Sequence, residues 1–248
     1  KGDFALIPKI IHYCWFGKGD MPKLETECIR SWKKHLPDYE FIMWNEERFD
    51  VTKHTFVKEA YEVNKYAFVS DYVRLYALYN YGGIYMDTDV EALKPLDPFL
   101  VHKAFIGCES DVLLGTGTIG AESGHPWIKD LLAEYENKRF ILPDGSYDTI
   151  PNTYLVAEFT KKAYGWEPKD AYQVLKEDLH VYPFDFFCAK DLRTGKICAN
   201  ENTYTIHRFS GSWKSKREKL NDEIKRIIGT KGTEFVVKVK NKIKGSRM

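Results

Sequence analysis

The chain of 248 residues contains no apolar run near the ~18 residues that a membrane-spanning helix requires. No charged segment followed by an apolar one opens it, so we expect no secretory signal in this sequence. Fixed-period repeats and low-complexity tracts are also absent, which argues against solenoid and array folds. With 44% hydrophobic and 29% charged residues, the chain can bury a sizeable core, and we expect one globular domain.

Cysteine pairs of the C-x-x-C type are missing too. The five cysteines are scattered along the chain, at Cys14, Cys28, Cys108, Cys188 and Cys198. This argues against a zinc ribbon or a thioredoxin-type redox site. We interpret most of these cysteines as small buried hydrophobic residues in a protein of a reducing compartment.

Basic and acidic residues are nearly equal in number over the whole chain, but they are unevenly distributed along it. The formal net charge is +1, yet residues 214–248 carry 12 Lys/Arg against 4 Asp/Glu. The sequence therefore predicts a main domain over residues 1–213 and a basic helix and tail over residues 214–248, packed on that domain or extending from it. The basic tail either contacts anionic lipid or is an ordinary solvated surface, and both interpretations stay open.

Hydrophobic patterning predicts an α/β fold. Residues 7–16 and 39–44 have the composition of buried strands, and Leu24, Cys28, Trp32 and Leu36 form the apolar stripe of a helix between them. This strand–helix–strand order predicts a parallel sheet with right-handed crossovers. Further strands are expected at 103–108, 118–121, 179–182 and 204–207, and further helices after His125, over 152–164 and over 214–228.

Residues 67–81 are predicted to form a helix, with an apolar face of Phe68, Tyr72, Leu75, Tyr76 and Tyr79. The glycines at 82 and 83 should end it, because glycine readily adopts a positive φ. An extended segment, residues 84–86, then leads to Asp87-Thr-Asp89.

Asp87 and Asp89 are candidate metal ligands. In an extended chain residues two apart face the same way, so their carboxylates can converge on one point, and anionic oxygens suit Mg²⁺ or Mn²⁺. The position after a strand places the pair at the carboxyl edge of the sheet, where ligands bind in open α/β folds. A solvated acidic turn is the alternative.

Two other polar groups accompany this pair. Asp71 and Arg74, at positions i and i+3, share one helix face and form either an intrahelical ion pair or a site for sugar hydroxyls. His207 follows a late predicted strand and precedes a turn rich in Ser and Gly. It is either a surface histidine or the residue that completes the metal site.

Five stretches together resemble a known family. They are Ile7-Pro-Lys-Ile-Ile-His12 with Trp15, Ser70-Asp-Tyr-Val-Arg-Leu-Tyr76, Tyr81-Gly-Gly-Ile-Tyr-Met-Asp-Thr-Asp89, Gly124-His-Pro126, and His207 with Ser212-Trp213. In this order they resemble glycosyltransferase family 32 of the DXD sugar-transferase group, which includes capsular polysaccharide transferases and yeast-type initiating mannosyltransferases. The core is also similar to that of the clostridial glucosylating toxins.

The resemblance implies a GT-A fold, with a Rossmann-like and mainly parallel sheet flanked by helices. It also implies a nucleotide-sugar donor with Mn²⁺ or Mg²⁺. Trp15 would stack on the donor's base, Asp71 and Arg74 would hold the donor sugar, and Asp89 would be the firmest metal ligand. Asp71, Arg74 and Asp87 would be the catalytic residues, and Asp87 would bridge sugar and ribose and also contact the metal. Tyr85 would contact the donor, His207 or Ser212 would complete the metal site, and Trp213 would cover the diphosphate. The chain departs from the family at 115–118, where Gly115-Thr-Gly-Thr118 stands near a position that is often Asn in the family.

The function implied is that of a retaining hexosyltransferase in surface polysaccharide or glycan synthesis. The acceptor would be a saccharide or a lipid-linked saccharide, and no nucleic-acid partner is expected. Trp15 favours a UDP-sugar as donor, with GDP-mannose open. We expect a cytoplasmic location, peripheral at the inner face of the membrane. A metal-dependent hydrolase of sugar nucleotides and a non-catalytic glycan-binding protein are the alternatives.

Overall fold

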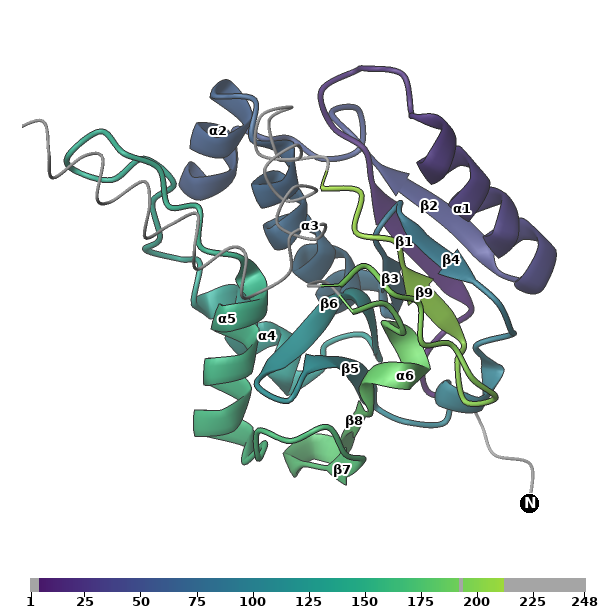
Figure 1. The fold of residues 1–248 in the computed structure, drawn as a ribbon. Helices are drawn as coiled ribbons and strands as arrows, with labels where there is room; N and C mark the ends of the chain where they lie inside the picture. Colours follow the sequence, from purple (N-terminus) through teal and green to yellow (C-terminus); the bar gives the residue numbers. More distant parts are fainter. Residues whose placement is uncertain (1–4, 192–193, 212–248) are drawn as a thin grey trace, which may run out of the picture.

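The computed structural model describes residues 5–191 and 194–211, which form a layered α/β fold around one large sheet (Figure 1). The strand order of this seven-stranded sheet is β2-β1-β3-β6-β5-β8-β7. In that order the strands are Glu40–Trp44, Ile10–Cys14, Gly83–Met86, Leu113–Ala121, Ala104–Ser110, Leu179–Tyr182 and Gln173–Val174. Val90–Ala92 (β4) and Thr205–His207 (β9) pair as a separate small sheet.

The α-helices are α1 (Lys23–His35), α2 (Thr55–Glu62), α3 (Tyr66–Tyr81), α4 (Pro126–Ala133), α5 (Asn152–Phe159) and α6 (Phe184–Phe187). Helix α5 continues into a π-helical turn, η2 (Thr160–Tyr164), and two 3₁₀ turns are present, η1 (Asp97–Phe99) and η3 (Lys176–Asp178). The helices and strands expected within the described residues are therefore present.

The large sheet is mixed. β1 pairs with β2 and β3 in parallel, and β5 pairs with β8 in parallel. β6 runs antiparallel between β3 and β5, and β7 is antiparallel to β8. Five of the seven strands therefore point the same way. This confirms the expected α/β fold class, a Rossmann-like and mainly parallel sheet flanked by helices.

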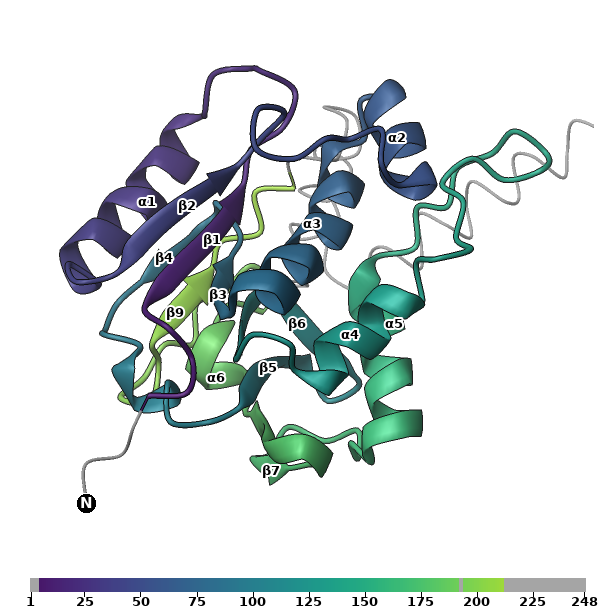
Figure 2. The same cartoon turned by 180° about the vertical axis from the view of Figure 1, so that it is seen from behind.

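Side chains from the two faces of the sheet enter two separate hydrophobic clusters. Along β3, Tyr85 belongs to one cluster, whereas Ile84 and Met86 belong to the other, as the alternation of a strand requires. Helices α2, α3, α4 and α5 cover the Tyr85 face, and α1, β4 and α6 cover the other. Figure 2 shows α3 and α4 in front of the sheet when the molecule is seen from behind.

Burial differs from the sequence prediction at two elements. β2 was expected to be a buried strand, but it lies at the edge of the sheet, and Glu40 and Met43 on it are exposed. The apolar stripe of α1 holds for Cys28, Trp32 and Leu36, which are buried, whereas Leu24 in the first turn is 36% exposed. Edge position and helix ends depend on neighbours that local patterning does not specify.

Helix α3 is buried more widely than its predicted face. Phe68 and Leu75 of that face are buried, but Tyr72, Tyr76 and Tyr79 are only partly so. Other positions around the helix are also buried, namely Val69, Asp71, Val73, Arg74, Ala77 and Leu78. The cause is the position of α3, which packs against the sheet as well as against α2 and α4. This brings the polar pair Asp71 and Arg74 into the interior.

Gly82 ends α3 with a φ of 64°, as predicted from the glycine pair. Its carbonyl oxygen lies 2.7 Å from His12 Nε2, and Trp44 Nε1 donates to His12 Nδ1 at 3.1 Å. Since an indole nitrogen can only donate, Nδ1 is the acceptor and Nε2 carries the proton that is donated to Gly82. Burial lowers the pKa of His12 to about 4. A neutral His12 thus joins β1 and β2 to the turn that starts β3.

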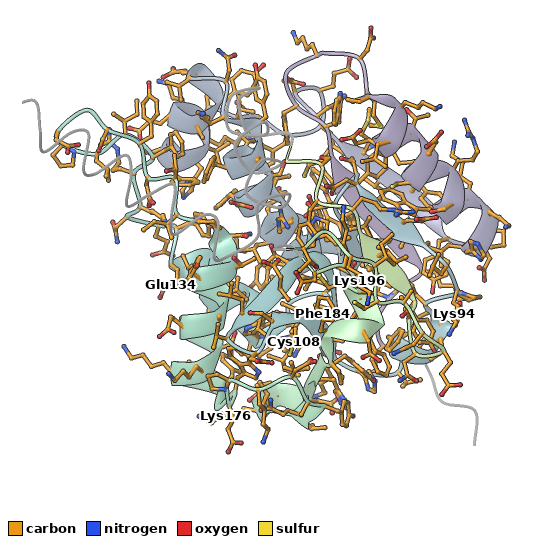
Figure 3. The ribbon with its side chains drawn as sticks, viewed as in Figure 1. Lys94, Cys108, Glu134, Lys176, Phe184 and Lys196 are labelled. Atoms are coloured by element: carbon orange, nitrogen blue, oxygen red, sulfur yellow. The ribbon has the colours of Figure 1, made fainter. Side chains whose placement is uncertain are left out.

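Four of the five cysteines are buried, all five are free, and Cys198 is exposed, which confirms the interpretation of most of them as small hydrophobic residues. Figure 3 shows Cys108 among the packed side chains, whereas Glu134 and Lys176 belong to the surface. None of the helices that the structure describes has the length and apolar character to cross a bilayer. The predicted helix at 214–228, the tail and both Ser212 and Trp213 lie outside the described residues, so the division at residue 213 stays a prediction.

The neutral state of His12 predicts a loss of stability in acid. Its pKa is lowered in the fold, so below about 6.5 the unfolded chain binds a proton that the folded chain does not. Between pH 6.5 and 4 the folded state should therefore lose up to roughly 3 kcal/mol through this group. Urea unfolding at pH 7 and pH 4.5 measures the loss. His12→Gln should reduce the difference between the two pH values, and an unchanged difference would contradict the assignment.

Candidate active site

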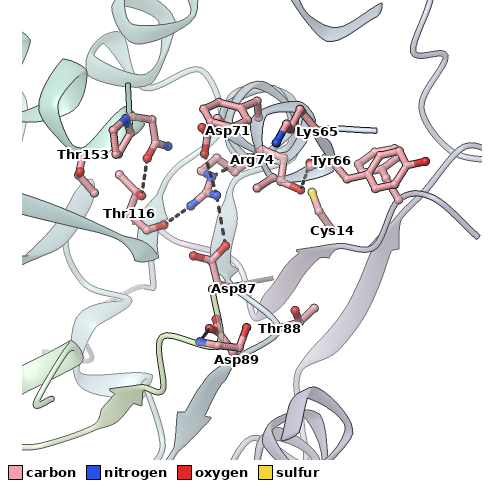
Figure 4. Close-up of a pocket in the computed structure, with 18 of the residues that line it drawn as sticks. Cys14, Lys65, Tyr66, Asp71, Arg74, Asp87, Thr88, Asp89, Thr116 and Thr153 are labelled. Carbon is pink, nitrogen blue, oxygen red and sulfur yellow. Dashed lines mark hydrogen bonds and ion pairs between the residues drawn. The ribbon is translucent and has the colours of Figure 1, made fainter. Parts of the chain in front are cut away.

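A cavity of about 910 Å³ opens at the carboxyl edge of β1 and β3 (Figure 4). Its walls come from five places: the loop after β1, the start of α3, the turn after β3, the β5–β6 hairpin with the start of α5, and the segment after β9. The predicted residues that line it are Trp15, Asp71, Arg74, Tyr85, Asp87, Asp89 and His207. Its volume is within the range of small-molecule sites.

Asp87 and Asp89 converge through a turn rather than through extended chain. β3 ends at Met86, the amide of Asp87 donates to the Gly117 carbonyl at 2.9 Å, and the amide of Val90 donates back to the Asp87 carbonyl at 2.9 Å. The sequence argument placed both carboxylates on one face of a strand, which is wrong in its geometry. The tight turn nevertheless directs both side chains into one place.

His207 reaches the same place through the small sheet. In that sheet Val90 of β4 is paired with His207 of β9, which fixes the histidine beside the turn. His207 Nε2 lies 3.3 Å from Asp89 Oδ1 and 4.0 Å from Asp87 Oδ2. Ligand atoms of Asp87, Asp89 and His207 all lie within 4.8 Å of one another. The sequence alone does not reveal this contact, because it arises from the pairing of two strands that lie more than 100 residues apart in the chain.

The charges in this cluster support one another. Burial works to lower the pKa of His207, but the neighbouring Asp89 carboxylate outweighs it and raises that pKa to about 9. Burial likewise works to raise the pKa of Asp89, yet His207 and the Ser210 amide, which donates to Asp89 Oδ2 at 2.7 Å, hold it below its usual value. Two carboxylates and an imidazole form a donor set that suits Mn²⁺ and accommodates Mg²⁺. The residues present therefore fit a divalent cation.

Arg74 connects the candidate sugar-binding pair to the metal cluster. Its Nη2 lies 3.1 Å from Asp71 Oδ1 and 3.2 Å from Asp87 Oδ1, and its Nη1 donates to the Thr116 carbonyl at 2.6 Å (Figure 4). The predicted intrahelical ion pair with Asp71 is present, but the guanidinium also serves β6 and the turn after β3. With Arg74 only 4% exposed, its main visible role is to hold these groups in place.

Asp71 and Tyr85 flank this guanidinium. Burial raises the pKa of Asp71 to about 7, with Arg74 opposing the shift. Tyr85 donates its hydroxyl hydrogen to Asp87 Oδ1 at 2.9 Å, and the Arg74 guanidinium lies 4.5 Å from its ring centre. Tyr85 is 1% exposed, so the structure places it behind Asp87 as a support for that carboxylate.

Trp15 lines the cavity from the loop that follows β1. Its Nε1 donates to the Gly19 carbonyl at 2.7 Å, which closes the loop 15–19 on itself and orients the indole. The ring is partly buried and lines the cavity. Stacking on a base stays a prediction, as do the roles of Ser212 and Trp213, which lie outside the described residues.

The sequence assigned no role to several other residues that line the cavity, among them Glu109, Thr116 and Asn152, of which only Thr116 lies in a segment singled out above, 115–118. Thr116 donates its hydroxyl hydrogen to Asn152 Oδ1 at 2.9 Å, so the first turn of α5 is joined to β6 at the cavity wall. None of the three belongs to a recognisable motif. Only the pairing of β5 with β6 and the packing of α5 on β6 bring them to the site.

Part of the chain is similar in sequence to known proteins. Residues 22–106 match the family model described as "Glycosyltransferase sugar-binding region containing DXD motif". The chain is 34% identical over 128 residues to inositol phosphoceramide mannosyltransferase 3 of Schizosaccharomyces pombe, covering 50% of this chain and 36% of that protein. It is 33% identical over 147 residues to mannosyl phosphorylinositol ceramide synthase SUR1 of Saccharomyces cerevisiae, covering 55% of this chain and 37% of that protein.

Two solved structures show a looser likeness. One, a PaToxG glycosyltransferase, has a TM-score of 0.47 and 19% identity over 63% of this chain and 69% of its own. The other, a glycosyltransferase involved in glycosylation of the PBCV-1 major capsid, has a TM-score of 0.47 and 11% identity over 87% and 98%. Likenesses at this level assign no function.

These matches indicate a class: residues 22–106 are similar to the DXD-containing sugar-binding region of glycosyltransferases. The resemblance to glycosyltransferase family 32 is confirmed, and the matched region contains Asp71, Arg74, Asp87 and Asp89. The chain spans little more than a third of the length of the curated relatives it matches. What those longer proteins act on is therefore a proposal for this chain.

The carboxylate cluster predicts cation binding that depends on Asp89. Asp89→Asn removes the anionic charge but keeps the size of the side chain, so Mn²⁺ should bind at least about tenfold more weakly. Isothermal titration of Mn²⁺ into the protein measures this. Asp111→Asn, in the exposed turn between β5 and β6, is the matched control and should bind Mn²⁺ like the unaltered chain. Equal affinities for both variants would show that the cluster is not a cation site.

Proposed function

We propose that this chain is the catalytic domain of a retaining hexosyltransferase that uses a divalent cation and a nucleoside-diphosphate sugar. The observation that carries the proposal is the cluster of Asp87, Asp89 and His207, with ligand atoms within 4.8 Å of one another at the wall of a 910 Å³ cavity. The two carboxylates are the DXD motif of the segment that matches the glycosyltransferase family.

The chemistry follows from the charges. Breaking the bond between the anomeric carbon and the phosphate oxygen leaves a nucleoside diphosphate with additional negative charge. A cation held by Asp87, Asp89 and His207 would stabilise that charge as a Lewis acid. Asp71 lines the cavity beside Arg74, where its carboxylate can accept hydrogen bonds from sugar hydroxyls. The acceptor hydroxyl would attack on the face from which the diphosphate leaves, so that configuration is retained.

Mannose is the hexose that the comparisons favour. The curated relatives are named as mannosyltransferases and as mannosyl phosphorylinositol ceramide synthases, which supports a mannosyl donor and a lipid-linked acceptor with an inositol phosphate headgroup. The partly buried indole of Trp15 at the cavity wall supports stacking on a nucleobase, which is guanine in GDP-mannose and uracil in a UDP-sugar. A role in capsule or other polysaccharide synthesis remains compatible with the same site.

The test is product analysis. The chain is incubated with Mn²⁺ and either GDP-mannose, UDP-glucose, UDP-galactose or UDP-N-acetylglucosamine, with methyl α-mannoside or inositol 1-phosphate as acceptor. We expect glycosylated acceptor with retained configuration by NMR, no product with EDTA, and recovery when Mn²⁺ is restored.

Asp87→Asn should lower turnover at least about a hundredfold, because it removes charge at the leaving group, whereas Asp111→Asn should not change it. Free sugar as the sole product in every reaction would favour a hydrolase of sugar nucleotides. Donor binding that is unaffected by EDTA and unaccompanied by any product would favour a glycan-binding protein.

We also propose that the protein is cytoplasmic and works at the inner face of a membrane. The support is the excess of basic residues over 214–248 in the sequence. Co-sedimentation with vesicles of 30% phosphatidylserine should fall when residues 230–248 are removed, and should fall in 0.5 M NaCl as an electrostatic contact requires. Equal binding by the full and shortened chains would reject the contact.

A further inference from the structure

Glu109 stands in a β-bulge at the wall of the cavity. Cys108 of β5 pairs with Leu114 of β6, and Ser110 pairs with Leu113, so Glu109 is an extra residue with no partner in the ladder. Such bulges re-aim a side chain and are frequent beside active sites. Glu109 is partly buried and lines the same cavity as the carboxylate cluster.

β6 lies in the sheet between β5, which carries Glu109, and β3, which leads to the Asp87–Asp89 turn. Two residues of β6 in this region are glycines and carry no side chain. Gly115 and Gly117 of β6 lie two apart and therefore on one face. A Cβ on Gly115 would lie 3.5 Å from the Cβ of Glu109, and a Cβ on Gly117 would lie 2.9 Å from His207 Nδ1 and 3.3 Å from Asp87 Oδ2. The two glycines thus let Glu109, His207 and Asp87 approach β6 closely, so that Glu109 and the cation cluster are neighbours across this strand.

Glu109 differs from the other carboxylates of the site. Asp71 and Asp87 are bound by Arg74, and Asp89 by His207 and Ser210. Among the described residues, no hydrogen bond or ion pair joins the Glu109 carboxylate. Burial raises its pKa, and the charge of His207 opposes this rise while that of Asp87 adds to it, as expected for a group close to the cluster but not within it.

Strand order places Glu109 on the far side of the cluster from Trp15. Trp15 follows β1, the Asp87–Asp89 turn follows β3, and Glu109 lies at the end of β5, two strands further along the sheet. A donor whose base stacks on Trp15 and whose diphosphate meets the cation occupies the first part of this path. The space beside Glu109 then remains for the second substrate.

We propose that Glu109 binds the acceptor, by accepting a hydrogen bond from one of its hydroxyl groups; this rests on the proposed transferase function. In the transfer, the bond between the anomeric carbon and the phosphate oxygen breaks, with its electron pair leaving on the diphosphate. The acceptor oxygen forms the new bond to that carbon, and its proton passes to a phosphate oxygen of the leaving group. Glu109 remains a carboxylate throughout and holds an acceptor hydroxyl next to the one that reacts.

The test separates acceptor from donor. Glu109→Gln keeps the size of the side chain but replaces a charged acceptor of hydrogen bonds, so the KM for methyl α-mannoside or inositol 1-phosphate, whichever turns over faster, should rise about tenfold. The KM for the nucleotide sugar, the affinity for Mn²⁺ and the rate of donor hydrolysis by water should stay within twofold of the unaltered chain. Glu134→Gln, an exposed glutamate at the end of α4 (Figure 3), is the matched control and should change none of them.

Three results would overturn the inference. A loss of Mn²⁺ affinity in Glu109→Gln would assign Glu109 to the cation site, and an unchanged KM for the acceptor would remove it from substrate binding. A glycosyl group trapped covalently on Glu109, detected by peptide mass spectrometry, would make it a nucleophile. If the unaltered chain transfers no hexose, the proposed function fails as well, whereas the first three results concern Glu109 alone. Thermal unfolding of Glu109→Gln close to that of the unaltered chain confirms that the kinetic changes are not losses of fold.

Discussion

One buried guanidinium organises the candidate site. Arg74 of helix α3 binds Asp71 of the same helix, and it joins this helix to the turn after β3 through Asp87 and to β6 through the Thr116 carbonyl. Burial works to lower its pKa, but Asp87, Tyr85 and Asp71 outweigh it, so the group stays charged. Removing one partner from such a buried network leaves an uncompensated charge, which typically costs about 3–5 kcal/mol. The position of the DXD turn therefore depends on a residue that is almost inaccessible to solvent.

This arrangement divides the site into two halves, which differ in how far the charges of the protein neutralise one another. Around Arg74, charges of the protein largely satisfy one another, and Tyr85 adds a hydrogen bond that orients the Asp87 carboxylate. Around His207, two carboxylates remain close to a single titratable partner, and a cation bound by all three side chains would take the place of the imidazole proton. The rigid half thus holds Asp87, and the exchangeable half faces the cavity. Catalysis of group transfer benefits from this division, since preorganised charge needs no rearrangement during the reaction.

The sequence predicted those parts of the fold that local chemistry determines. The glycine pair at 82 and 83 correctly ended α3, and hydrophobic periodicity located most helices and strands. The antiparallel direction of β6, the edge position of β2 and the wide burial of α3 depend on tertiary contacts and were not predicted. The same holds within the site. Spacing in the chain indicated Asp71, Arg74, Asp87 and Asp89, whereas only the β4–β9 pairing explains how His207 joins them, and only a β-bulge brings Glu109 to the cavity.

The departure from the family pattern at residues 115–118 has a physical reason. A side chain at Gly117 would approach His207 Nδ1 to 2.9 Å, so glycine at this position makes room for the histidine of the metal cluster. The next residue back, Thr116, uses its carbonyl for Arg74 and its hydroxyl for Asn152 of α5. A carboxamide thus still lines this wall of the cavity, although it comes from a helix and not from β6. Because Arg74 binds the backbone of Thr116 whereas Asn152 binds its side chain, a substitution at this position removes the link to α5 and leaves the acceptor for Arg74 in place.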